Sequence, residues 1–296
     1  MKTDVTIIIP TYNRSKQLKK CIESCLSQTY PCEIIVCDHG STDDTCLVAE
    51  TYGNKIKYIR REKDNGPLFC WYDGIINSTT EFVHLQYDDD IILPNFILKT
   101  RELMREDVLC ALTKVSVVNT KQEEIYTANH FSSSGIDDLK ILNKYTSINL
   151  ISPASMLLRK EDALLACYPS GTPIFPKSFK GAGSDWLFCK SFNSKYKYFG
   201  YVNDKLAIFS FHDGSITVDA FKDEKKRREL SRTYDNARIF FMVGQFININ
   251  SVQSLLRLLL KILKTKNIIS IYGWKYFINT YIFKRNDITR KKHNTR

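Results

Sequence analysis

Three consecutive carboxylates, Asp88, Asp89 and Asp90, are the residues of this 296-residue chain best suited to chemistry. They follow an apolar, β-branched run at 81–87 that indicates a buried strand. Adjacent carboxylates repel each other, and burying their charge costs free energy unless a cation neutralises it. Mg²⁺ or Mn²⁺ suits such a place, since these ions are held by one or two carboxylates together with substrate phosphates. The alternative is a solvated acidic turn that caps the next helix. When the triplet is considered alone, this alternative is favoured, because short motifs often occur without the function.

The elements around this triplet alternate between strands and helices. Short β-branched runs predict strands, and apolar residues three or four positions apart predict helices between them. The predicted strands of the first half are 5–9, 33–37, 56–60 and 81–87. This alternation predicts an α/β fold with a mainly parallel sheet covered by helices on both faces.

A polar turn follows each of these strands, at residues 11–14, 38–41, 64–66 and 88–90. The carboxyl ends of parallel strands lie at one edge of a sheet, and ligands bind outside that edge. We therefore expect the four turns to converge. This convergence favours a binding site over the solvated acidic turn.

Apolar residues that recur three or four positions apart predict one helix with an apolar face. They are Leu18, Cys21, Ile22, Cys25 and Leu26. In the second half of the chain, further strands are predicted at 108–119 and 206–211 and a helix at 161–167, whereas the polar stretch 120–150 predicts an irregular loop.

Two further candidates lie in the second half. Asp185 follows a serine that can cap a helix, and it is either a general base or a first-turn residue favoured by the helix dipole. His212 follows the predicted strand 206–211 and is either a ligand or a surface histidine.

The composition is that of a globular protein, with 43% hydrophobic and 25% charged residues. The sequence shows no signal-peptide pattern and no apolar run of the roughly 18 residues that span a bilayer. Nine cysteines, none of them in a Cys-x-x-Cys pair, argue against a disulfide framework or a zinc site. We therefore expect a cytoplasmic protein with reduced thiols.

Positive charge is concentrated at the C-terminus. Residues 221–296 hold 18 Lys and Arg against 5 Asp and Glu, whereas the first 220 residues are close to neutral. Leucine-rich, cationic and aromatic segments at 251–292 predict helices on an anionic membrane surface. The alternative is a helical hairpin packed on the preceding domain. No RNA-binding motif occurs, so we expect no nucleic-acid partner.

Several segments resemble the family 2 glycosyltransferases, inverting enzymes with a Rossmann-like GT-A fold. The matching stretches are Ile7-Ile-Ile-Pro-Thr-Tyr-Asn-Arg14, Leu26-Ser-Gln-Thr-Tyr-Pro31, 33–45, 64–66 and 88–94. The resemblance is good over residues 4–110 and weaker to about 217. It implies a nucleotide-sugar-binding catalytic domain at 1–220, with a donor half at about 1–110 and an acceptor half at about 111–220. The basic helical extension at 221–296 follows it.

The resemblance also implies roles for individual residues. Asp185 matches the general base, and Asp89, Asp90 and His212 match the group that holds Mn²⁺ or Mg²⁺. The implied nucleotide-sugar pocket comprises Pro10, Thr11, Tyr12, Arg14, Asp38, His39, Asn65, Gly66 and Asp88. His39 and Tyr87 depart from the family's pattern, which has an acidic residue at the first position and, in one common form, aspartate at the second.

These expectations describe a metal-dependent inverting glycosyltransferase. The donor would be a UDP- or dTDP-linked sugar, and the acceptor a hydroxyl of a glycan or a lipid-linked molecule. The enzyme would work at the inner face of the cell membrane, in the synthesis of bacterial surface polysaccharide. The alternative is a non-catalytic nucleotide-sugar-binding relative that acts in a membrane-associated complex.

Overall fold

The structure is a computed structural model. It describes residues 3–63, 66–131, 133–148, 151–167, 185, 188–189, 195–212, 218, 223–231 and 234. The chain divides into two units, Met1–Thr233 and Tyr234–Arg296, and the first unit contains all of these residues except Tyr234. Asn65 and the predicted membrane-binding segment 251–292 lie outside the described residues.

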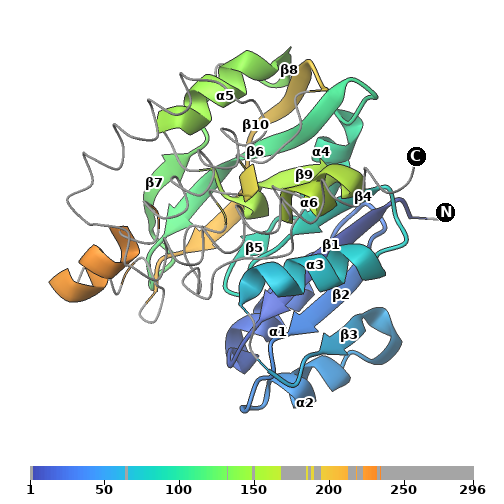
Figure 1. Ribbon diagram of the computed structural model, residues 1–296, viewed down its shortest axis with the longest axis vertical. Coiled ribbons are helices and arrows are strands. Elements are labelled where there is room, and N and C mark those ends of the chain that lie inside the picture. The colour runs from blue at the N-terminus through green and yellow to red at the C-terminus, as the bar shows by residue number, and fades with distance from the viewer. Residues whose placement is uncertain are drawn as a thin grey trace, which may run out of the picture. The chain divides into compact units, whose positions relative to one another are not determined.

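Strands and helices alternate through the first half of the chain, as predicted (Figure 1). They are β1 Val5–Thr11, α1 Ser15–Leu26, β2 Glu33–Asp38, α2 Thr45–Glu50, η1 Gly53–Lys55, β3 Lys57–Arg60, α3 Pro67–Asn77 and β4 Phe82–Leu85. β1 pairs in parallel with both β2 and β4, and β2 pairs in parallel with β3. The predicted parallel sheet is therefore confirmed for this half.

The second half extends the same sheet with mixed pairing. Its elements are β5 Ile91–Ile92, α4 Phe96–Glu102, β6 Val108–Val118, β7 Glu124–Ala128, β8 Gly135–Asp138, α5 Leu139–Ile148, η2 Pro153–Ser155, β9 Met156–Arg159, α6 Lys160–Cys167 and β10 Tyr198–Ser210. The strand order is β3-β2-β1-β4-β9-β6-β10-β5. β6 and β10 are parallel, but β9 runs antiparallel to β4 and β6. The sheet is thus parallel among β1, β2, β3 and β4 and mixed beyond them.

The prediction of an irregular loop at 120–150 is wrong, because β7, β8 and α5 all fall in this stretch. β7 pairs antiparallel with β6, and its first three residues are exposed. A strand exposed in this way does not need the apolar alternation that marks a half-buried strand. Its pairing with β6 decides its conformation instead.

Helices cover both faces of the sheet because the strand residues alternate between the two sides. Ile7 and Ile9 of β1 pack in the cluster that contains residues of α1, α2 and α4. Ile8 packs on the opposite face with residues of α3, α5 and α6. Figure 1 shows α3 and α6 near each other on one face of the sheet. On helix α1, Leu18, Cys21, Ile22 and Cys25 are buried as predicted, whereas Leu26 is 38% exposed.

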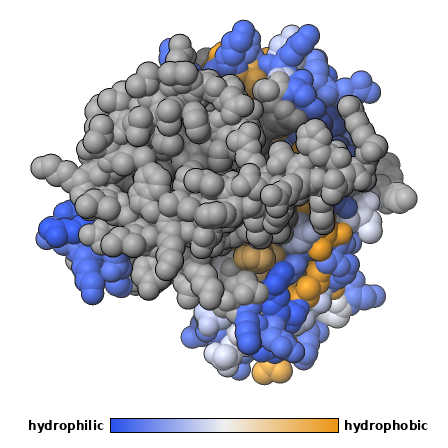
Figure 2. All heavy atoms as spheres, viewed as in Figure 1, coloured by the Kyte–Doolittle hydropathy of each residue, from blue (hydrophilic) through white to orange (hydrophobic). Residues whose placement is uncertain are grey.

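The surface of the described residues is mainly hydrophilic on the face seen in Figure 2, with hydrophobic residues interspersed. The exposed large hydrophobic residues belong to several different elements, including α2, α3 and β7. All nine cysteines are free thiols. Within the described part of the chain, no helix is both long and apolar enough to cross a bilayer.

Candidate active site

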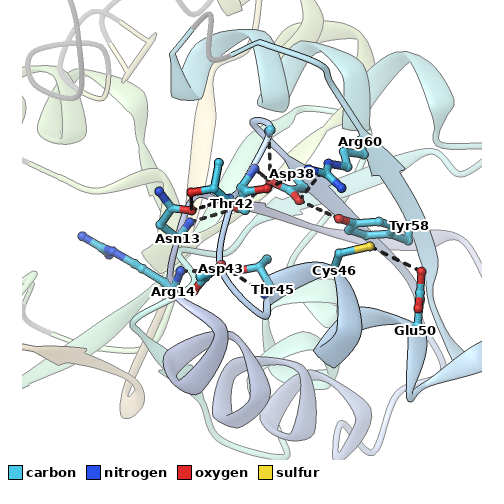
Figure 3. Close-up of polar contacts among 12 residues, drawn as sticks. Asn13, Arg14, Asp38, Thr42, Asp43, Thr45, Cys46, Glu50, Tyr58 and Arg60 are labelled. Carbon is cyan, nitrogen blue, oxygen red and sulfur yellow. Dashed lines mark hydrogen bonds and ion pairs between the residues drawn. The ribbon is translucent and has the colours of Figure 1, made fainter.

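The turn after β1 and the turn after β2 are joined by hydrogen bonds (Figure 3). The Asn13 backbone N–H donates to the Ser41 hydroxyl at 2.9 Å, and the Asn13 side-chain oxygen accepts from the Thr42 N–H at 2.7 Å. Asn13 has φ 53°, a left-handed conformation in which asparagine is enriched. The Ser15 N–H donates to Asp43 at 3.2 Å. These bonds hold the two predicted binding turns together at the sheet edge.

Asp38 is fully buried and stabilises its own turn. Its Oδ1 accepts from the Ser41 hydroxyl at 2.6 Å and from the backbone N–H groups of Ser41 and Gly40 at 2.8 and 3.0 Å. Its Oδ2 accepts from the Tyr58 hydroxyl at 2.6 Å and lies 3.8 Å from Arg60 Nε. A carboxylate offers about four lone-pair positions, so these partners use most of its capacity. The structure places Asp38 as a support for the turn, and its contact with a nucleotide stays a prediction.

The acidic triplet meets the turn after β1 through Thr11 and Arg14. The Thr11 hydroxyl donates to Asp88 Oδ2 at 2.8 Å. Nη1 of Arg14 donates to Asp88 Oδ1 at 3.1 Å and to Asp89 Oδ2 at 2.5 Å. In Figure 3 the Arg14 side chain extends away from the turn network that its backbone joins. The guanidinium thus supplies the neutralising charge that adjacent buried carboxylates require.

His212 reaches the same triplet from the far end of the described sheet. Its Nε2 lies 3.1 Å from Asp89 Oδ2. The pairing of β5 with β10 explains this contact, because it places Ile91 opposite Ile208. The same pairing lets the Ser210 N–H donate to Asp90 Oδ1 at 3.0 Å. Of the three residues predicted to hold a metal, Asp89 and His212 are therefore in contact, whereas Asp90 binds the end of β10.

The three carboxylates differ in their pKa values. Burial raises the pKa of Asp88 to about 6, against the opposing charge of Arg14. Burial also raises the pKa of Asp90, and the charge of Asp89 adds to this effect. Burial alone would raise the pKa of Asp89, but the hydrogen bond with His212 and the charge of Arg14 lower it. Asp89 is therefore the member of the triplet most readily ionised, which is the state that binds a cation.

Asp89 and His212 offer a carboxylate oxygen and an imidazole nitrogen, a donor pair compatible with Mn²⁺. Among the residues that the structure describes, no three His, Cys, Asp or Glu side chains form a group that could hold a metal. A cation at this place would complete its coordination with water and with donor phosphates, as Mg²⁺ commonly does in phosphate-binding sites. Asp89 and His212 therefore fit a divalent cation whose remaining ligands are water and donor phosphates.

The other residues predicted for the donor pocket lie along the first two strands and at α3. Pro10 is inside β1, opposite Cys37 of β2. Tyr12 is 43% exposed, and its ring centroid is 6.3 Å from that of the buried His39. Gly66 precedes α3 with φ 92°, a conformation that favours glycine. Their contacts with a donor stay predictions.

Asp185 is partly buried. It is helical, and so are Phe188 and Cys189. The Cys189 thiol donates to the Ile151 carbonyl at 3.2 Å, which ties this segment to the residues before β9. The Phe188 ring meets Trp71 of α3 edge to face, with centroids 5.5 Å apart. The role of Asp185 as a base stays a prediction.

Sequence reasoning did not single out Ser41 and Tyr58, which hold Asp38, as members of the site. Ser41 carries a weak signal, since a serine three residues after an aspartate is a common turn pattern. Tyr58 carries none, because its role depends on the pairing of β3 with β2.

The chain matches the model of Glycosyl transferase family 2 over residues 6–164. It is 26% identical to the glycosyltransferase GlyG of Streptococcus pneumoniae over 53% of this chain and 57% of that protein. It is 30% identical to a chondroitin synthase of Escherichia coli over 43% of this chain and 19% of that protein. An uncharacterised glycosyltransferase of Rickettsia prowazekii is 40% identical over 31% of this chain, and the chain spans only 29% of its length.

Two solved structures share the fold. One is TarS 1–349 of S. aureus in complex with UDP-GlcNAc, with a TM-score of 0.59 and 20% identity over 82% of this chain and 73% of that chain. The other is the mannosyltransferase PcManGT of Pyrobaculum calidifontis in complex with GDP-Man and Mn²⁺. Its TM-score is 0.51, and it is 12% identical over 95% of this chain and 80% of that chain. The predicted GT-A, Rossmann-like architecture is thereby confirmed.

The family match covers more than half of the chain and includes the two interlocked turns and the acidic triplet. The GT-A fold of the solved relatives agrees with it. On this evidence, the chain belongs to glycosyl transferase family 2.

Proposed function

We propose that this protein is a metal-dependent, inverting glycosyltransferase that uses a nucleotide-diphosphate sugar, UDP- or dTDP-linked. The observation that carries the proposal is the meeting of Arg14 and His212 at Asp89, at the carboxyl edge of the sheet. A cationic guanidinium, an ionised carboxylate and an imidazole at this edge suit the binding of a diphosphate.

The reaction that we propose for these groups and Asp185 has three parts. The acceptor oxygen attacks the anomeric carbon, the bond from that carbon to the diphosphate oxygen breaks, and the acceptor proton passes to Asp185. Attack from the face opposite the leaving group inverts the configuration. Thr11 and Arg14 hold the Asp88 and Asp89 carboxylates in place for the donor. A divalent cation held by Asp89 and His212 would neutralise charge on the departing diphosphate.

Nucleotide-sugar use is supported by the solved structures of similar fold, one with UDP-GlcNAc and one with GDP-Man and Mn²⁺. The acceptor we propose is a glycan or a lipid-linked molecule in bacterial surface polysaccharide synthesis. The basic segment 251–292 would hold the catalytic domain, residues 1–220, at the cytoplasmic face of an anionic membrane. The 18 Lys and Arg of residues 221–296, the stretch that contains this segment, support this part of the proposal.

Binding of nucleotide diphosphates and their sugars, with and without Mn²⁺, tests the proposal. Thermal unfolding is a suitable measurement, since a ligand at a hundred times its Kd stabilises by about 2.7 kcal/mol. Wild type should be stabilised by one nucleotide only when the metal is present, and Asp89→Ala should lose this effect.

Asp204→Ala is a matched control, since Asp204 is an exposed aspartate that pairs with Lys99. It should respond to the nucleotide as wild type does. If no nucleotide stabilises wild type under any metal condition, the proposed donor site is wrong.

A further inference from the structure

Tyr87 directly precedes the acidic triplet, and its ring stacks on Trp71 of α3. The two ring centroids are 6.1 Å apart and the ring planes differ by 10°. Trp71 is only 2% exposed, whereas Tyr87 is partly exposed. The Tyr87 ring is therefore held on one side by a buried indole and remains accessible beside the carboxylates.

The same aromatic group reaches the segment that carries Asp185. Trp71 packs edge to face on Phe188, which lies three residues, about one helical turn, after Asp185. Asp185 and Asp90 both act electrostatically on Tyr87. The ring contacts of Tyr87, Trp71 and Phe188 thus connect the acidic triplet to the helical residues near the proposed base.

Trp71 also carries an unmet hydrogen-bond donor. Its indole Nε1 is buried and has no hydrogen-bond partner among the described residues. An unsatisfied buried donor costs about 1–3 kcal/mol, so such a group favours a ligand oxygen or an ordered water that accepts from it.

In the proposed reaction the transferred sugar lies between the diphosphate at Asp89 and the attacking hydroxyl at Asp185. We propose that Tyr87 is a specificity-determining residue that contacts this sugar, with Trp71 behind it. Its ring packs on the C–H face of a pyranose and its hydroxyl binds a sugar hydroxyl, while the Trp71 N–H donates to an ordered water behind the Tyr87 ring. This inference rests on the proposed function.

Tyr87→Phe tests the inference, because it keeps the ring on Trp71 and removes only the hydroxyl. The Kd values of UDP, dTDP and GDP, with Mn²⁺, first identify the nucleotide that the full-length chain binds. The Kd values of its glucose, galactose, mannose and N-acetylglucosamine derivatives are then compared between wild type and variant by titration calorimetry. We expect the nucleotide diphosphate to bind within about twofold of wild type and the preferred sugar derivative to bind about tenfold more weakly.

Tyr126→Phe is the matched control, since Tyr126 is an exposed tyrosine of β7. It should leave both Kd values unchanged. Trp71→Phe removes the unpartnered N–H, keeps an aromatic ring behind Tyr87 and provides a second variant if Tyr87→Phe does not fold. It should weaken the sugar derivative more than the nucleotide diphosphate.

An equal loss of affinity for nucleotide and nucleotide sugar, or no loss for either, would overturn the role of Tyr87 while leaving the proposed function intact. Absence of nucleotide binding by the wild-type chain would instead overturn the proposed function, and this inference with it.

Discussion

His212 Nε2 lies 3.1 Å from Asp89 Oδ2, although 123 positions separate the two residues. The contact exists because the two-residue strand β5 pairs with β10 just after the acidic triplet and just before His212. The first 110 residues of the chain therefore do not complete the candidate site by themselves. The last described strand of the sheet supplies the imidazole.

Replacing Arg14 tests its role as the counter-charge of the triplet. Arg14→Ala leaves Asp88 and Asp89 without their guanidinium partner, and breaking a buried ion pair costs roughly 3 kcal/mol. We expect Mn²⁺ to restore part of this loss, because a divalent cation supplies the missing charge. Thermal unfolding with and without Mn²⁺ measures both effects.

Arg228→Ala is the control for this experiment, since Arg228 forms an exposed ion pair with Glu224. Its response to Mn²⁺ should equal that of wild type. If Arg14→Ala gains no more stability from Mn²⁺ than this control does, the cation does not replace the charge of Arg14 at the acidic triplet.

The Asp38 turn should depend strongly on one carboxylate. Asp38→Ala leaves the N–H of the partly buried Gly40 and the N–H and hydroxyl of the buried Ser41 without their acceptor, so we expect a loss on the order of 3 kcal/mol in the free energy of unfolding. Tyr58→Phe removes one hydrogen bond to the same carboxylate and should cost about 1 kcal/mol. Urea unfolding of the two variants measures the difference, and equal losses would contradict a supporting role for Asp38.

Stability should fall at mildly acidic pH because of His84. Burial lowers the pKa of His84, although hydrogen bonds with the Met156 carbonyl and the Gln86 amide oppose this shift. Below the unfolded-state pKa of about 6.5, the unfolded chain binds a proton that the folded ring resists. The His84 contribution is therefore complete above this pH and falls by up to about 1.4 kcal/mol per pH unit below it, until the folded ring is protonated.

The His84→Gln variant isolates this effect when urea unfolding is measured from pH 7.5 down to about pH 5. Asp88 acts in the opposite direction, since its pKa rises to about 6 and protonation then favours the folded state. The difference between wild type and variant removes the Asp88 contribution. A pH-independent difference would show that His84 does not titrate in this way.

Gly74 permits the close approach of α3 to β1. A Cβ at this position would lie 2.2 Å from Ile8 Cγ2. Gly74→Ala should therefore destabilise by about 1–3 kcal/mol, although alanine is the better helix former. Ile8→Ala removes the clashing atoms, so the double variant should cost less than the sum of the two single changes. If the two single losses in the free energy of unfolding, measured in urea, add up to the loss of the double variant, the strain of Gly74→Ala does not come from Ile8.

Prediction from sequence worked where the signal was local and failed where partners were distant. The predicted buried face of α1 is correct from Leu18 to Cys25, but Leu26, which was also predicted to lie on it, is exposed. β5 was missed because two isoleucines are too short a run for any periodicity. β7 was missed because its first three residues are exposed and its strand state comes from pairing with β6.

The sequence by itself determined the alternating strands and helices of the first half and the placement of polar turns at strand ends, because hydrophobic periodicity and turn chemistry act over a few residues. Only the tertiary structure decided the partner of each carboxylate. Asp89 meets Arg14 and His212, Asp90 meets Ser210, and Asp38 is enclosed by its own turn and Tyr58. Most of these contacts depend on the pairing of strands far apart in the chain, whose register no local pattern specifies.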